Sequence, residues 1–144
     1  LEALVLGPGD LAVSLGVPEL TIGEGPHVPY ALMRVLVAAR AHGVSAVDGP
    51  FVVVDDLDGL RASAVRSAAL GYDGKWCIHP SHVEVLNEVY APTPEQLERA
   101  RRILAIEGVE RLDSEMVDEA TRKMAAAIVA RAGGEPDRSA PRRQ

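Results

Sequence analysis

The stretch that most constrains this chain is Leu4–Ala12, which reads LVLGPGDLA. A short apolar run, long enough for one buried strand, ends there in a Gly-Pro-Gly turn that delivers the carboxylate of Asp10. Open α/β sheets and α/β barrels place ligand chemistry at the carboxyl ends of buried parallel strands. Asp10 is therefore a candidate metal or substrate ligand. The competing interpretation is that Asp10 caps the short helix or turn that follows, and this stretch alone favours the cap.

Composition excludes several classes of protein. The chain has 144 residues, the size of one ordinary domain, and its core is expected to be aliphatic because hydrophobic residues make up 47% but aromatic residues only 3%. A net charge of -6 leaves no basic face for a phosphate backbone, so nucleic acid is not an expected partner. No apolar run approaches the roughly 20 residues of a membrane helix, so no membrane association is expected.

The single cysteine and the first residue bear on cellular context. Cys77 has no second cysteine to pair with, which fits a reducing compartment and predicts a cytoplasmic protein. No signal peptide is visible. The chain starts at Leu1, directly in a strand-like run and without methionine, which indicates the middle of a longer protein.

Hydrophobic periodicity predicts alternating strands and helices. Strand regions are expected near 4–6, 44–54 and 76–78, and helices over 30–41, 58–70, 82–90, 94–107 and 114–132. Such alternation is typical of parallel strands joined by helical crossovers. Three strands cannot close an eight-stranded barrel, which needs about 250 residues.

Local signals mark the helix starts. Asp55 is expected to cap the helix over 58–70, because the calcium-loop alternative for Asp55, Asp56 and Asp58 lacks its glycine and its terminal glutamate. Ser81 with Glu84, and Thr93 with Gln96, each predict a capping box. Asp113 is expected to cap the last helix, whose predicted apolar stripe is Met116, Ala120, Met124, Ala127 and Ile128.

Two further positions are candidates for chemistry. Asp48 and Gly49 follow a second apolar run and precede Pro50, which repeats the arrangement around Asp10. His27 lies in the Gly/Pro-rich loop over 17–29, where it is either a ligand or simply solvated, and solvation is favoured.

Several motifs occur in a characteristic order. They are Gly9-Asp10-Leu11-Ala12-x-Ser14-Leu15-Gly16, Ala39-Arg40-Ala41-x-Gly43, Asp48-Gly49-Pro50, Gly71-Tyr72-x-Gly74-Lys75-x-Cys77-Ile78-His79-Pro80, Pro92-Thr93-Pro94-Glu95 and Met116-Val117-Asp118. In this order they resemble the C-terminal half of the citrate lyase β-subunit-like family of the HpcH/HpaI aldolase superfamily, which includes malyl-CoA lyases. The resemblance covers residues 1 to 132.

The resemblance implies an α/β fold that is the C-terminal portion of a TIM (β/α)8 barrel with a C-terminal helical extension. About three parallel strands with crossover helices belong to the barrel part. The expected organisation is a partial barrel over residues 1–90, a helical extension over 91–133 and a disordered tail over 134–144.

The resemblance also implies a site. Asp10 is expected to bind Mg2+, with Mn2+ as the alternative metal, while the second carboxylate ligand and a substrate-binding arginine of the family lie outside this chain. Asp118, in the Met-Val-Asp motif, is expected to act as acid/base in a neighbouring subunit's site. Without the resemblance, Asp118 is an ordinary exposed aspartate in a helix's first turn. Gly9, Leu11, Asp48 and Gly49 are further candidates for substrate contacts.

The implied activity is Mg2+-dependent cleavage of a β-hydroxyacyl-CoA, with CoA bound as part of the substrate and the full-length form a trimer or hexamer. The chain by itself is expected to be inactive. Three alternatives stay open: a malyl-CoA thioesterase of the same family, a non-catalytic half-barrel that serves as an association module, and a pyruvate-class aldolase. The Ile-His-Pro strand and the Asp118 motif favour the CoA branch over the last of these.

Overall fold

The computed structural model describes residues 1–18, 22–108, 110–112 and 114–133. Its contacts divide into two compact units, Leu1–Tyr90 and a second one that begins at Ala91. The predicted tail over 134–144 and the predicted cap Asp113 lie outside the described residues. Within the described part of the chain, no helix is long and apolar enough to cross a membrane.

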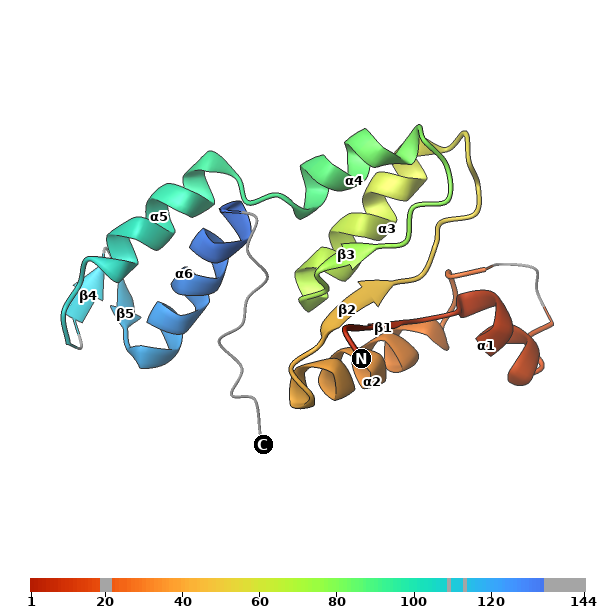
Figure 1. The fold of residues 1–144 in the computed structure, drawn as a ribbon, viewed down its shortest axis with the longest axis horizontal. Coiled ribbons are helices and arrows are strands. Elements are labelled where there is room, and N and C mark those ends of the chain that lie inside the picture. Colours follow the sequence, from red (N-terminus) through yellow and green to blue (C-terminus); the bar gives the residue numbers. More distant parts are fainter. Residues whose placement is uncertain (19–21, 109, 113, 134–144) are drawn as a thin grey trace. The chain divides into compact units, whose positions relative to one another are not determined.

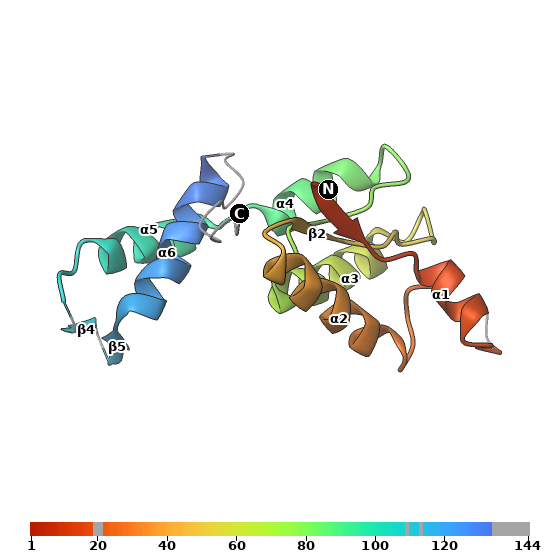
Figure 2. The same ribbon diagram turned by 60° about the horizontal axis from the view of Figure 1, so that its bottom comes forward.

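The first unit alternates strands and helices as the periodicity predicts. Its elements are β1 (Ala3–Val5), α1 (Pro8–Ser14), α2 (Val28–Ala41), β2 (Ser45–Asp48), α3 (Leu57–Leu70), β3 (Gly74–Lys75) and α4 (His82–Tyr90). The strands form one parallel sheet in the order β1-β2-β3, so β1 and β3 are its edges (Figures 1 and 2). This confirms the predicted α/β class with helical crossovers.

One face of the sheet carries the aliphatic core. Leu6 and Ala46 pack with a buried face of α2, and Tyr72 completes this cluster. The Tyr72 hydroxyl donates to the carbonyl of Leu32 at 2.8 Å, and burial raises the pKa of this phenol to about 12, with a smaller contribution from the charge of Asp48. A second cluster joins α3 to α4 around Leu60 and Leu86.

The opposite face of the sheet is bare. Side chains alternate along a strand, so Val5 and Val47, which are partners in the register, point away from the face that holds Ala46. Val5 is 48% exposed, and a Cβ added to Gly74, the next partner along, would meet no atom within 4 Å. No described helix covers this apolar side of the sheet.

One aspartate, Asp73, joins three elements at the amino end of the sheet. Asp73 accepts two hydrogen bonds from the guanidinium of Arg40, at 2.8 and 2.9 Å, and a third from the Ala46 amide at 2.8 Å. Arg40 also donates to the carbonyl of Gly71 at 2.6 Å. These bonds join the end of α2, the start of β2 and the turn before β3.

Two predicted strand segments are wrong. Residues 51–54 form no strand, because Pro50 lacks the N–H that would continue the ladder and Phe51 turns into the core between α3 and α4. The strand predicted at 76–78 lies two residues earlier, as β3. Trp76 is 54% exposed and Ile78 45%, because no described strand lies beyond β3 to cover them.

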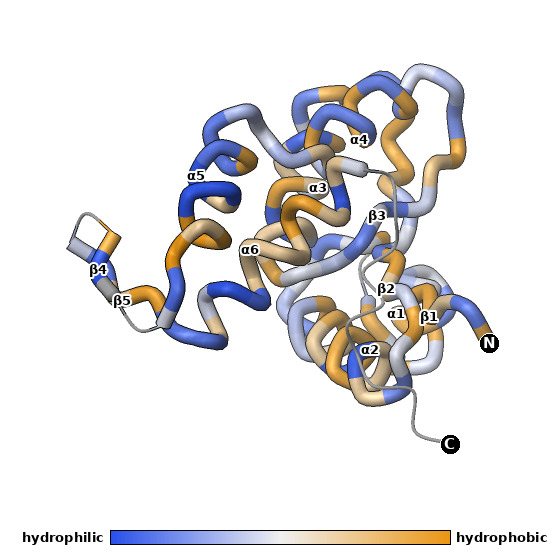
Figure 3. Tube along the Cα trace, turned by 60° about the vertical axis from the view of Figure 1, so that its left-hand side comes forward, coloured by the Kyte–Doolittle hydropathy of each residue, from blue (hydrophilic) through white to orange (hydrophobic). Residues whose placement is uncertain are grey.

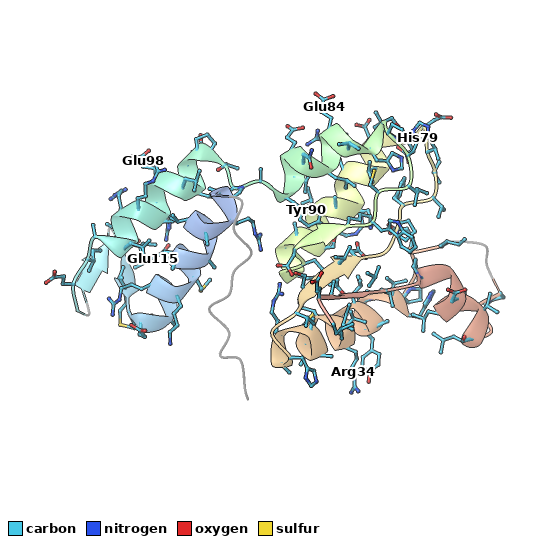
Figure 4. All side chains as sticks on the ribbon, viewed as in Figure 1. Arg34, His79, Glu84, Tyr90, Glu98 and Glu115 are labelled. Atoms are coloured by element: carbon cyan, nitrogen blue, oxygen red, sulfur yellow. The ribbon has the colours of Figure 1, made fainter. Side chains whose placement is uncertain are left out.

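Two predicted helix caps in this unit are also wrong. The carboxylate that accepts the Gly59 amide at the start of α3, at 2.9 Å, belongs to Asp56 and not to Asp55. Ser81 does not make the predicted capping box. Its hydroxyl lies 2.7 Å from Nδ1 of His79, the side chain labelled in Figure 4 between β3 and α4.

The second unit contains α5 (Pro94–Leu104), β4 (Glu110–Leu112), β5 (Glu115–Val117) and α6 (Glu119–Ala132). The capping box of Thr93 and Gln96 at the start of α5 is confirmed. α5 is coloured hydrophilic along most of its length in Figure 3. Its buried residues Ala100 and Ile103 pack with Val117 and Ala125.

The predicted helix over 114–132 is wrong at its start. Its first residues form β5, which pairs antiparallel with β4, and the helix begins only at Glu119. The predicted apolar stripe is displaced accordingly, since Met116 is 64% exposed and Met124 70%, while Ala125 is buried. Pairing with β4 buries Val117, which an uninterrupted helix would not place against α5.

Candidate functional site

The carboxyl end of β1 leads directly into α1. Gly7 is the N-cap residue and Pro8 occupies the first helical position, so the helix begins before Asp10 and the capping interpretation of Asp10 is wrong. Asp10 lies in the first turn, is exposed, and takes part in no side-chain hydrogen bond or ion pair with any described residue. A Cβ at Gly7 would lie 3.1 Å from Oδ2 of Asp10, so the carboxylate lies close over the turn.

The carboxyl end of β2 differs although its sequence is similar. Asp48 is buried, and both of its carboxylate oxygens are used: Oδ1 accepts the Gly49 amide at 2.7 Å and Oδ2 accepts Nζ of Lys75 at 2.6 Å. Alternation along β2 places Asp48 on the same face as Ala46, which packs against α2. Asp48 is thus oriented toward the protein interior.

The two strand ends touch through small residues. A Cβ added to Gly49 would lie 2.6 Å from Cδ of Pro8 and 2.7 Å from the Leu6 carbonyl oxygen, so only glycine fits. Gly9 faces Ile22, whose side chain would lie 3.8 Å from a Cβ there. Leu11 packs partly buried against the core, whereas Asp48 and Gly49 are buried, so of the four candidate substrate residues Asp48 and Gly49 expose the least surface.

The carboxyl end of β3 carries the Cys77-Ile78-His79-Pro80 segment. The Cys77 thiol donates to the His79 carbonyl oxygen at 3.1 Å, and His82 lies fully buried with Nε2 3.2 Å from the Val54 carbonyl oxygen. His27 caps α2 in position only, without a side-chain bond to the helix. Nε2 of His27 and Nδ1 of His82 are buried without a hydrogen-bond partner among the described residues, so the prediction that His27 is simply solvated is wrong for this nitrogen.

Asp118 lies in the second unit, as the N-cap of α6. Its Oδ1 accepts the amide of Thr121 at 2.8 Å and the Thr121 hydroxyl at 2.9 Å. These hydrogen bonds, the amide first, hold the pKa of Asp118 below its ordinary value. The side chain is therefore an ionised carboxylate near neutral pH, a form that can accept a proton.

Lys75 belongs to the Gly-Lys motif of the sequence, but its partner in the site region does not follow from that motif. It lies directly opposite Asp48 in the register of β2 and β3. No local pattern predicts this pairing, because the two residues are 27 positions apart in the chain. Only the strand register, which the sequence leaves open, brings them together.

The donor groups of the described residues do not make a complete site for a divalent metal. Among residues 1–18, 22–108, 110–112 and 114–133, no three His, Cys, Asp or Glu side chains are grouped closely enough to hold an ion. Mg2+ in proteins uses one or two carboxylates and completes its shell with water and substrate oxygens. The carboxylate of Asp10 fits one such position, and further ligands would have to come from outside the described part of the chain.

The sequence profile of the HpcH/HpaI aldolase/citrate lyase family matches residues 1–80 of this chain. The chain belongs to this family. It is 37% identical over 155 residues to an L-malyl-CoA/β-methylmalyl-CoA lyase of Cereibacter sphaeroides, an alignment that covers 92% of this chain and 49% of that protein. A (3S)-malyl-CoA thioesterase of the same organism is 40% identical over 116 residues, covering 77% and 39%.

Solved structures of the family show the same fold. CitE from Mycobacterium tuberculosis, in complex with magnesium, acetoacetate and coenzyme A, superposes with a TM-score of 0.75 at 32% identity and covers 90% of this chain and 51% of that one. A citrate lyase from Burkholderia xenovorans gives a TM-score of 0.77 at 25% identity, with coverage of 99% and 50%. The chain thus spans about half the length of these relatives, and its three parallel strands are part of a TIM barrel.

Proposed function

We propose that this chain is the C-terminal part of a Mg2+-dependent lyase that cleaves a β-hydroxyacyl-CoA. The observation that carries the proposal is the exposed carboxylate of Asp10, which has no partner among the described residues, at the carboxyl end of a parallel strand in a chain of this family. The malyl-CoA lyase relative and the magnesium and coenzyme A bound to CitE support the choice of metal and substrate class.

In the proposed reaction, a C–C bond breaks between the α-carbon of the thioester and the carbon that bears the hydroxyl group. The hydroxyl group gives its proton to a base from outside this chain, a 2-oxo acid forms, and the electron pair of the broken bond becomes the enolate of acetyl-CoA or propionyl-CoA. The enolate carbon then takes up one proton to give the product thioester. A bound Mg2+ supplies the positive charge that polarises and orients the oxo-acid end of the substrate. Asp10 would hold that ion, together with ligands from outside this chain.

Asp118 is proposed to exchange the proton at the CoA-ester carbon. As a carboxylate it can take the proton in the condensation direction, and in cleavage its protonated form would return that proton to the enolate carbon. The Thr121 hydrogen bonds that lower its pKa favour the ionised form. Following the resemblance, we propose that it acts in a neighbouring subunit's site within a homo-oligomer. The side-chain position of Gly49 faces Pro8 and that of Gly9 faces Ile22, so any substrate contact of these two residues would use their backbone groups.

The same residues are proposed to work only when the barrel is completed. The bare face around Val5 and Val47 and the two edge strands need further parallel strands, and the site on the described residues needs a further carboxylate. We therefore expect no turnover from the 144-residue chain by itself.

The thioesterase relative favours one alternative, in which the same site activates water and hydrolyses the thioester. The bare sheet favours another, in which the chain only associates with a second polypeptide through its strand edges. These alternatives differ in their products, because a lyase releases a 2-oxo acid and keeps the thioester, a thioesterase releases free CoA thiol, and an association module releases neither.

The test co-expresses the chain with the N-terminal half of a malyl-CoA lyase and assays malyl-CoA with and without Mg2+. Lyase activity predicts a Mg2+-dependent 2-oxo acid signal without free thiol. Asp10→Asn should remove this signal, whereas Asp58→Asn, an exposed aspartate in the first turn of α3, should leave it unchanged. Near-normal rates in Asp10→Asn would remove Asp10 from the site.

A further inference from the structure

Lys75 is buried at the carboxyl end of β3, and the proposed function gives it no role. Its side chain is 4% exposed and that of Asp48 is 8% exposed, with Nζ 2.6 Å from Oδ2. A buried ion pair adds little stability over well-packed apolar residues of the same volume, because both charges must be taken out of water. The pair does orient the backbone at Gly49, whose amide donates to the Asp48 carboxylate.

Asp48 is fixed by hydrogen bonds on both of its sides. Its Oδ1 accepts the Gly49 amide at 2.7 Å, and its backbone carbonyl accepts the amide of Trp76, the residue after Lys75, at 2.8 Å. The ammonium of Lys75 therefore holds the one carboxylate that sets the backbone at Gly49. The end of β2 is tied to the end of β3 at this level of the sheet.

Gly49 contacts most closely two residues that follow β1, Leu6 and Pro8. It lies so close to Pro8 and to the Leu6 carbonyl that a Cβ would come within 2.6 and 2.7 Å of them. Pro8 is the first residue of α1, and the Leu11 amide closes the first turn on the Gly7 carbonyl at 3.0 Å. Asp10 lies on that turn, so its position depends on where Gly49 is held.

We infer that Lys75 and Asp48 form a positioning pair for Asp10. Lys75 orients Asp48, Asp48 holds Gly49 against Pro8, and this contact fixes the turn that presents the Asp10 carboxylate. Asp48 is then a positioning residue and not a substrate contact. The geometric part of this inference stands on the chain alone, and its consequence for the metal rests on the proposed function.

The geometric part is tested by amide NMR spectra of the 144-residue chain. Lys75→Met should displace the amide resonances of Gly49, Gly9 and Asp10. The matched control is Arg40→Met, which breaks the ion pair at the amino end of the same sheet and should lower the melting temperature without moving those amides. Unmoved Gly9 and Asp10 amides in a folded Lys75→Met chain would overturn the inference.

The consequence for the metal is tested in the chain co-expressed with the N-terminal half of a malyl-CoA lyase. Lys75→Met should raise the Mg2+ concentration for half-maximal rate by about 10-fold or more, as for other residues that orient metal ligands, with a smaller change in the rate at saturating Mg2+. An unchanged Mg2+ requirement in Lys75→Met, combined with complete loss of turnover in an Asp48→Asn protein whose spectrum shows that it is folded, would instead make Asp48 a substrate contact.

A double variant without either buried charge keeps the inference testable if Lys75→Met does not fold. The double variant Asp48→Asn/Lys75→Met removes both buried charges together. The side-chain amide that replaces the Asp48 carboxylate keeps an oxygen for the Gly49 N–H. It no longer has the Lys75 ammonium to orient that oxygen. The Gly9 and Asp10 amides should again be displaced, and unchanged resonances count against the pair. If the complemented wild type shows no Mg2+-dependent turnover, the proposed function fails while the NMR result still decides the geometric inference.

Discussion

The carboxyl ends of β1 and β2 have nearly the same sequence pattern and opposite structures. Each is an apolar run followed by a turn with Gly and Pro and a carboxylate. Asp10 is exposed and has no partner among the described residues, whereas Asp48 is buried and bonded through both oxygens. A carboxylate at a strand end is thus equally suited to bind a ligand or to hold the ends of the strands together, and only its neighbours decide which.

The difference arises from where each carboxylate sits relative to its turn. Asp48 is the last residue of its strand, so it shares the sheet's register and lies opposite Lys75. Asp10 comes after its turn, inside the first turn of α1, where no neighbouring strand of the described chain reaches it. A shift of a few residues past the turn therefore separates a free carboxylate from a structural one.

The largest effect is expected from Asp48→Asn. Removing one member of a buried pair leaves the Lys75 charge uncompensated, which should lower the free energy of unfolding by about 3–5 kcal/mol. Urea unfolding of the chain measures this. A loss below about 1 kcal/mol, the value for an exposed pair, would break the comparison by making Asp48 as free as Asp10.

The next effect is expected from Gly49→Ala. The new methyl group would lie 2.6 Å from Pro8 and 2.7 Å from the Leu6 carbonyl, and this overpacking should cost about 1–3 kcal/mol. Gly74→Ala is the matched control, since its methyl group would meet no atom within 4 Å. Equal stability of the two variants in the same urea titration would show that the two strand ends are not in contact.

A smaller effect concerns Asp118, the carboxylate that caps α6. Its pKa in the folded chain is lowered from 3.8 by the Thr121 hydrogen bonds, so it contributes stability above that pH and loses it as the pH falls through the lowered pKa. The melting temperature should therefore fall below pH 3.8 more steeply in the wild type than in Asp118→Asn. Parallel acid curves would contradict a structural role for this carboxylate.

The smallest effect is expected from Asp10→Asn. Because the carboxylate has no partner among the described residues, its neutralisation should change the free energy of unfolding by no more than about 0.5 kcal/mol. Urea unfolding beside Asp48→Asn measures the contrast directly. A loss comparable to that of Asp48→Asn would mean that Asp10 also serves the fold.

Features set by neighbouring residues could be predicted from the sequence. The capping box of Thr93 and Gln96 was predicted correctly, because all of its atoms lie within four consecutive residues. Helix α2 was likewise predicted from its own periodicity, although it begins two residues earlier than expected, at Val28. The family could be identified because its motifs keep their order along the chain, and the family profile matches residues 1–80.

Features set by distant residues could not. β5 was predicted as helix because its apolar residues fit either period, and only its pairing with β4 decides for a strand. The pair of Asp48 and Lys75 needed the register of two parallel strands. The proposed roles of Asp10 and Asp118 stay predictions, since neither side chain is shown against a ligand.

The bonds of Asp73 at the amino end of the sheet have a consequence for how such a protein can change. They join α2, β2 and the turn before β3 without using any residue of the carboxyl-end turns. The amino ends are thus held by bonds separate from those of Asp48 and Lys75 at the carboxyl ends, where α/β barrels place their chemistry. Loops at the carboxyl ends of the strands can accumulate substitutions that change the substrate without breaking the bonds of Asp73. This suits a chain whose relatives include both lyases and thioesterases.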